Sequence, residues 1–432
     1  MSSPVHPEEP VRPGYRAVFR VREFRAVFAA HLLSLLGVVV AEISLTVLVY
    51  GLTGSPLLGA LTFALGFLPY VVGGTLLASV ADRHPARRVL VVCDLVCGGC
   101  ALLMALPGTP VAVLLALRCA LAAVAPVFTG TRAAALTDIL GEGELYVLGR
   151  SLLRIVSQSA MFAGFGAGGL LLAFVSPRRA ICLTVLTFLC SALLLRFGTR
   201  ARPARAGQAP RTPAAADSLA AARRLLADRR VRALMLLFWI PALFVVAPEA
   251  LAAPYADALG AGPGAVGLMM SAMAVGHVGA ELYAGSRLSP RSRDRIVLPL
   301  AALGTVPLAG YAFLPDLGWA LLLLVLSGAS AAYLIGLDRW FVGAVPEELR
   351  GRAMTLMTAG LMTAQGVGMA LAGLAAEFWP VHHVVAGSGV LGALCCLVLV
   401  ARARRHGVGA TALAAPVPTE VRDGADHDVT NG

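Results

Sequence analysis

The chain has 432 residues, of which 58% are hydrophobic and 14% are charged, and its mean hydropathy is +0.80. Too little polar surface is available to coat a water-soluble globule of this length, so the composition excludes an ordinary soluble protein and predicts one that uses the bilayer as its solvent. The formal net charge is +11, but the arginines stand between apolar segments instead of on one basic face, which argues against nucleic acid as a partner.

Apolar segments bounded by Gly, Pro and charged residues predict twelve membrane-spanning helices, because about 20 apolar residues cross a hydrocarbon core. The first six are expected at 26–50, 55–81, 88–106, 110–137, 151–175 and 179–197. The second six are expected at 232–254, 263–285, 296–314, 318–341, 352–378 and 382–401. The expected fold is therefore all-α and integral to the membrane, with twelve transmembrane helices in two pseudo-symmetric six-helix bundles.

These helices divide the chain into five segments. They are a cytoplasmic N-terminal segment at 1–25, a first bundle at 26–198, a linker at 199–231, a second bundle at 232–402 and a disordered cytoplasmic tail at 403–432. The linker is rich in Arg, Pro and Ala, and its part at 218–232 has a helical period. This part is predicted to be an amphipathic helix, either at an anionic membrane surface or in solution.

The distribution of arginine predicts the orientation. One set of loops carries nearly all of the arginines, together with the N-terminus and the linker, whereas the opposite set carries only Arg178 and Arg179. Cytoplasmic loops retain positive charge, so both termini and the linker are expected in the cytoplasm, and the chain is expected to be a multi-pass protein of the cell membrane.

Identical residues recur at a constant offset of 207 positions between the two halves. The pairs are Pro56 and Pro263, Gln158 and Gln365, Gly166 and Gly373, and Glu42 and Glu249. Because these pairs fall on corresponding helices, they favour a duplication with parallel topology.

An ionisable side chain within the hydrocarbon is costly unless it is paired or hydrated, so each one is a candidate functional residue. Glu42 and Glu249 lie at similar depths on the first and seventh helices, where they could carry a proton or contact a substrate. Alternatively, Arg118 neutralises Glu42, or both carboxylates are hydrated at the outer surface. Arg118 itself needs a partner for its charge.

His277 and Glu281 stand four residues apart on the eighth helix. Side chains at this spacing share one helix face, so these two could pass a proton between them. A structural role, with the histidine simply satisfied by a neighbour, is the alternative. We assign the pair to the same predicted proton-coupling or substrate cavity.

The loop after the second helix reads Ala78-Ser-Val-Ala-Asp82-Arg83-His-Pro-Ala-Arg87-Arg88-Val-Leu and resembles the acidic-basic loop signature of the major facilitator superfamily. The family usually has Gly at the place of Ala78 and another near Pro85. The resemblance implies a cytoplasmic gating latch formed by Asp82, Arg83, Arg87 and Arg88. Alternatively, these arginines only follow the positive-inside rule.

Further stretches extend this resemblance along the chain. Arg118 occupies the place of the superfamily's intramembrane arginine, and Gly164-Phe-Gly-Ala-Gly168-Gly169 resembles a glycine motif of exporters, with Phe165 where exporters have Pro. Tyr50 to Pro56 and Val345 to Arg352 look like the branch of enterobactin-exporter-like and macrolide-efflux-like proteins. Small residues allow close helix packing. The glycines expected to do so are Gly164, Gly166, Gly168, Gly169, Gly366 and Gly368.

The resemblance implies export of a small amphiphilic compound of the drug, antibiotic or siderophore class, driven by protons through alternating access. The expected partners are the substrate, protons and the lipid bilayer, and we expect a monomer without cofactor or metal. An inward symporter or facilitator of a nutrient has the same fold and is the nearest alternative. A membrane enzyme is a distant one, because the chain has no HExxH, no Walker loop, no nucleophile elbow and no clustered acidic metal ligands.

Overall fold

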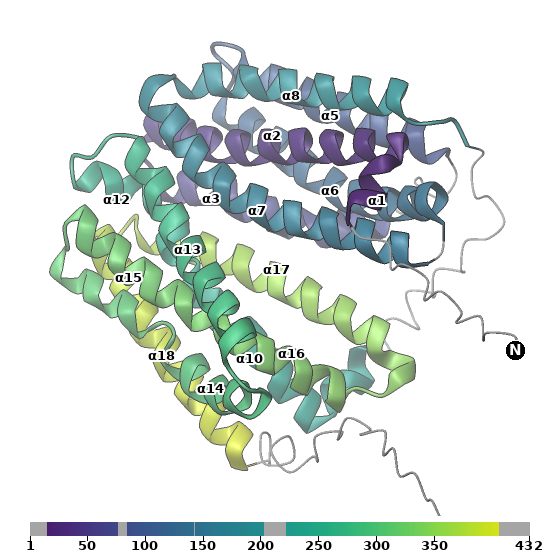
Figure 1. Cartoon of the computed structure of the whole chain (residues 1–432). Coiled ribbons are helices and arrows are strands. Elements are labelled where there is room, and N and C mark those ends of the chain that lie inside the picture. The colour runs from purple at the N-terminus through teal and green to yellow at the C-terminus, as the bar shows by residue number, and fades with distance from the viewer. Residues whose placement is uncertain (1–14, 77–83, 142, 203–221, 406–432) are drawn as a thin grey trace, which may run out of the picture.

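The structure is a computed structural model that describes residues 15–76, 84–141, 143–202 and 222–405. All regular elements in these ranges are helical, and they form an N-terminal and a C-terminal group of helices (Figure 1). The N-terminal group comprises α1 (Tyr15–Arg20), α2 (Arg22–Thr53), α3 (Pro56–Leu76), α5 (Ala86–Ala105), α6 (Val111–Leu140), α7 (Glu144–Phe174) and α8 (Pro177–Gly198).

The C-terminal group follows the linker. Its elements are α10 (Arg229–Val245), α11 (Ala247–Ala250), α12 (Ala252–Ala258), α13 (Gly264–Arg287), α14 (Pro290–Leu303), the 3-10 helix η1 (Val306–Phe313), α15 (Leu317–Ala329), η2 (Ser330–Ala332), α16 (Tyr333–Ala344), η3 (Glu347–Leu349), α17 (Arg350–Ala375) and α18 (Val381–Arg405). The part of the linker that the structure describes is helical at 222–227.

Ten helical segments of the described chain are long and apolar enough to cross a membrane, and apolar stretches of α3 and α7 add two shorter ones. Each of the twelve predicted helices has its counterpart among these segments. The predicted all-α, twelve-helix membrane fold is therefore confirmed.

Three predicted helices are not continuous α-helices, and the tenth predicted helix passes through the 3-10 turn η2 between α15 and α16. The seventh is broken after Val245 and continues as α11 and α12, and Pro248 lies in the first turn of α11. The ninth changes from α14 to the 3-10 helix η1, where Pro307 lies in the first turn. Proline has no backbone N–H and clashes with the preceding turn, so it begins a new helix more readily than it continues an old one.

The two groups pack against each other at the end of the molecule where α2 ends and α3 begins, which we call the Tyr50 end. Here α3 packs on α17 and α7 packs on α13, and the groups diverge from this end toward α1 and α16 (Figure 1). A Cβ atom on Gly169 would collide with the backbone of Gly267, and one on Gly166 would lie 3.0 Å from the Ser271 hydroxyl. Glycine therefore permits backbone contact between α7 and α13.

Within the N-terminal group, a buried carboxylate ties three helices together. Asp94 on α5 is fully buried and accepts hydrogen bonds from Ser34 on α2 at 2.8 Å and from Ser191 on α8 at 2.6 Å. The two serine hydroxyls are also 2.8 Å apart. A buried polar group is tolerated only when it is hydrogen-bonded, and both carboxylate oxygens of Asp94 meet this condition.

Candidate functional site

A cavity of about 460 Å³ lies among the helices of the C-terminal group, with α7 contributing one side chain. Its walls are mainly apolar and include four methionines and three aromatic rings. The methionines are Met269, Met270, Met273 and Met357, and the rings are Phe165, Phe238 and Tyr333. Such a cavity is of the size that small organic ligands occupy, and flexible methionine side chains adapt to different shapes.

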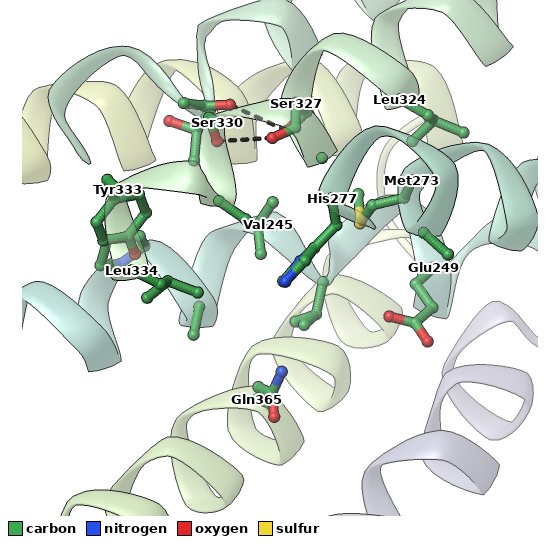
Figure 2. A pocket seen from close by; sticks show the side chains of 18 of the residues that line it. Val245, Glu249, Met273, His277, Leu324, Ser327, Ser330, Tyr333, Leu334 and Gln365 are labelled. Atoms are coloured by element: carbon green, nitrogen blue, oxygen red, sulfur yellow. Dashed lines mark hydrogen bonds between the residues drawn. The ribbon is translucent and has the colours of Figure 1, made fainter. Parts of the chain in front are cut away.

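The cavity is also lined by carboxylate, imidazole and amide side chains. Glu249 comes from α11, His277 and Glu281 from α13, Asp338 from α16 and Gln365 from α17. Figure 2 shows the imidazole of His277, the carboxylate of Glu249 and the amide of Gln365 directed into the same space. Nε2 of His277 is 3.3 Å from Oε1 of Glu281, so the two side chains predicted to share a helix face also contact each other.

The break between α10 and α11 positions Glu249. Pro248 lies in the first turn of the short helix α11, and the next residue, Glu249, is partly buried and points into the cavity (Figure 2). Within the described part of the chain, its carboxylate forms no hydrogen bond or ion pair. The negative charge of Glu42 also acts on it. Glu249 is therefore a carboxylate that lacks the usual compensation for burial.

Glu42 has a different environment. It is ion-paired with Arg118 on α6, and both side chains are nearly inaccessible, with 12% and 8% of their surfaces exposed. Nε of Arg118 also donates to the carbonyl oxygen of Thr62 at 3.1 Å. A Cβ atom on Gly66 would collide with the Arg118 guanidinium, so this glycine makes room for the pair.

Sequence reasoning placed Glu42 and Glu249 at similar depths on the first and seventh helices and named pairing with Arg118 as the alternative for Glu42. The structure brings the two carboxylates within electrostatic range and also forms the Arg118 pair. Only Glu249 is among the described residues that line the cavity. The two glutamates at the 207-residue offset are therefore not equivalent.

At the Tyr50 end, polar contacts that sequence reasoning did not identify join the two groups. The Tyr50 hydroxyl donates to Oδ2 of Asp257 at 3.1 Å. Oε1 of Glu377, which follows α17, accepts hydrogen bonds from the Ser55 hydroxyl and, at 3.0 Å, from the backbone N–H of Leu57. Tyr50 and Asp257 are separated by 207 residues, so the repeat offset was the signal that could have found them.

The predicted gating loop is only partly described. Asp82 and Arg83 lie outside the described residues. Arg87 donates to the backbone carbonyl of Thr199 at 3.0 Å, which ties the start of α5 to the end of α8, and Arg88 is exposed. The latch among these four residues stays a prediction.

The four remaining predicted packing glycines lie on α7 in the N-terminal group and on α17 in the C-terminal group. Gly164 and Gly168 face α2, where added Cβ atoms would lie 3.0 and 2.9 Å from its side chains. Gly368 on α17 faces the backbone of Leu243 on α10, and Gly366 is buried. Gly164, Gly168 and Gly368 are thus tightly packed, as expected of glycines between close helices.

A further acidic residue, Asp294 on α14, was not singled out from the sequence. It is buried and ion-paired with Arg339, and its Oδ1 accepts a hydrogen bond from the Trp340 indole at 2.9 Å. Arg339 thus supports α14, whereas its neighbour Asp338 lines the cavity. Among the described residues, no group of three or more His, Cys, Asp or Glu side chains is arranged to hold a metal ion.

Comparison with known proteins identifies the family of the chain and solved structures with a similar fold. The family model described as Major Facilitator Superfamily matches residues 27–253 and 242–423. No curated protein sequence matches the chain. Among solved structures, the nucleoside transporter NupG is similar with a TM-score of 0.63 at 16% identity, over 87% of this chain and 99% of that one.

Two other solved structures are similar to a comparable degree. A POT peptide transporter in complex with alafosfalin has a TM-score of 0.66 at 15% identity, over 92% of this chain and 97% of that one. A D-xylose-proton symporter has a TM-score of 0.64 at 14% identity, over 87% and 96%. At these identities the similarity establishes the fold and not the substrate.

Proposed function

This chain belongs to the Major Facilitator Superfamily, and we propose that it exports a small amphiphilic organic compound in exchange for protons. Membership makes the chain a membrane transporter and not an enzyme. The observation that carries the proposal is the cavity of about 460 Å³ with Glu249 in its wall. The apolar walls suit an amphiphile of the drug, antibiotic or siderophore class.

Glu249 is the proposed proton carrier. A carboxylate in an apolar wall without a cation beside it is more stable when it holds a proton, because the neutral form needs no compensating charge. Glu42 suits this role less well, since the Arg118 guanidinium stabilises its ionised form. Proton uptake from one side and release to the other at Glu249 would drive the cargo in the opposite direction.

The His277 and Glu281 pair is the proposed route between Glu249 and water. The two side chains contact each other at 3.3 Å, and about a third of each is exposed. Histidine exchanges protons near neutral pH, so such a pair can relay a proton without a large rearrangement.

The contacts at the Tyr50 end support alternating access. We assign this end to the outside of the cell, because the arginine-rich loops lie at the other end. With the halves joined at the outer end and diverging from it, the structure corresponds to the state that faces the cytoplasm (Figure 1). Rocking of the two groups about the cavity would then open the cavity alternately to the cytoplasm and to the outside.

The test uses inside-out vesicles that contain the protein and carry a pH gradient. A panel of amphiphilic compounds is added, and loss of the gradient is recorded for the wild type, for Glu249→Gln and for Glu347→Gln. Glu347 is a matched control because it is exposed on η3, outside the cavity. We expect at least one compound to release the gradient in the wild type and in Glu347→Gln but not in Glu249→Gln.

Two results would overturn the proposal. Counterflow of a solute without any proton movement would indicate a facilitator. Proton movement in the same direction as the solute would indicate a symporter, like the structurally similar D-xylose-proton symporter.

A further inference from the structure

A second cavity lies outside the candidate site, on the surface of the N-terminal group between the start of α2 and the end of α8. Its volume is about 690 Å³. From α2 it is lined by Arg22, Arg25, Ala26 and Ala29, and from α8 mainly by Cys190, Leu193 and Phe197. We call it the α2–α8 groove.

The spacing of these residues explains the shape of the groove. On each helix, the lining residues follow the intervals of three and four that place side chains on one face. Ala26 and Ala29 are small, so the side chains of α2 fill little of the groove. Gly198 closes the groove at its arginine end, because a Cβ atom there would collide with Ala26.

The wall formed by α8 is apolar and uncovered. Leu193 is 56% exposed and Phe197 is 77% exposed. Both belong to a helix that is long and apolar enough to cross the membrane. In the bilayer, this wall therefore faces lipid chains and not water.

The end of the groove formed by α2 is positively charged. Arg22 and Arg25 are exposed, and within the described part of the chain neither forms an ion pair. Glu23, which stands between them, already has two partners, Arg202 at 2.7 Å and Arg200 at 3.5 Å. Among the described residues, nothing neutralises Arg22 or Arg25, so both can attract an anion from the membrane surface.

We propose that the α2–α8 groove binds one anionic phospholipid. Arg22 and Arg25 hold its phosphate, and the first part of an acyl chain lies along Leu193 and Phe197. The stretch from Arg22 to Ala29 rises about 10 Å at 1.5 Å per residue, which matches the upper part of an acyl chain. A soluble anion would use the arginines but not the apolar wall, whereas the combination fits a lipid at the membrane surface.

Cys190 offers a direct test because it is exposed and lies at the apolar end of the groove. Cys182 is exposed on the same helix but is not among the lining residues, so it serves as an internal reference. The purified full chain in detergent is treated with N-ethylmaleimide, and labelling of each cysteine is followed by peptide mass spectrometry. The additions are phosphatidylglycerol, phosphatidylcholine with the same acyl chains, or inorganic phosphate.

We expect phosphatidylglycerol to slow labelling of Cys190 at least three-fold relative to Cys182, with little effect of phosphatidylcholine or phosphate. The variant Arg22→Gln/Arg25→Gln should lose this protection. The control Arg402→Gln/Arg404→Gln removes the same charge from exposed positions at the end of α18 and should keep it.

Several results would contradict the lipid site. Equal protection by both lipids would show that the arginines do not select the headgroup. Protection by phosphate alone would indicate a soluble anion, and no protection by phosphatidylglycerol would show that this lipid does not occupy the groove. Loss of protection in the α18 control would show a general effect of charge.

Discussion

The Tyr50 hydroxyl donates a hydrogen bond to the Asp257 carboxylate at 3.1 Å, and the two residues stand 207 positions apart, the same interval that separates Glu42 from Glu249. Corresponding positions of the two halves therefore meet across the interface between them. In a duplicated transporter, such a contact can form only when the halves are closed at that end.

We predict that Tyr50→Phe combined with Glu377→Ala shifts the molecule toward the state that opens at the Tyr50 end. Tyr50→Phe removes one hydrogen bond and Glu377→Ala removes two. At about 1 kcal/mol for each lost hydrogen bond, the population ratio should change roughly 150-fold for the pair. Spin labels at Leu52 and Phe378, both exposed near this end, would report longer distances. Tyr15→Phe, which removes a hydroxyl contact inside the N-terminal group, should leave the distances unchanged.

The Glu42–Arg118 pair should matter for stability more than for coupling. Arg118→Gln leaves a nearly inaccessible carboxylate without its cation and should destabilise the protein by about 3–5 kcal/mol. The double variant Glu42→Gln/Arg118→Gln should lose less stability than the two single variants lose together, because neither charge is then left without its partner. Thermal unfolding in detergent measures this.

Arg350→Gln is the control for that series, since its pair with Glu347 is exposed and such pairs contribute about 0–1 kcal/mol. Equal destabilisation by Arg118→Gln and Arg350→Gln would disprove the assigned role of the buried pair.

Gly169→Ala should disturb closure at the Tyr50 end, because the new methyl group meets the backbone of Gly267. Alanine raises helix propensity by about 1 kcal/mol, so any loss of transport cannot come from a weakened helix. We expect the initial transport rate in vesicles to fall at least ten-fold. Gly99→Ala adds the same methyl group where nothing lies within 4 Å and should transport normally. A normal rate for Gly169→Ala would show that the contact is not needed.

Asp94→Ala should destabilise the N-terminal group, because it strands the buried hydroxyls of Ser34 and Ser191. The expected cost is about 2–4 kcal/mol, from two unsatisfied groups at about 1–3 kcal/mol each, partly relieved by their mutual contact. Asp94→Asn keeps the size and one acceptor and should recover part of the loss. The measurement is the unfolding temperature of the wild type, Asp94→Ala and Asp94→Asn. Equal unfolding temperatures would show that the hydrogen bonds of Asp94 do not stabilise the N-terminal group.

The sequence predicted the twelve helices because long apolar segments leave few alternatives in a bilayer. It did not predict the break at Pro248, which turns Glu249 into the cavity, because a proline in an apolar segment is compatible with both a kink and a break. It also predicted that Arg118 needs a partner without deciding that Glu42 is that partner. Which charges meet depends on helix rotation, and weak amphipathicity does not determine the rotation of a helix buried on most sides.

The most direct test of the account measures proton release when a cargo identified in the vesicle assay binds to the purified protein. The measurement uses a pH-sensitive dye in weak buffer, with wild type, Glu249→Gln and Glu347→Gln. We predict that binding releases protons from the wild type and Glu347→Gln and none from Glu249→Gln. The same release from Glu249→Gln as from the wild type would contradict the assignment of Glu249 as the proton carrier.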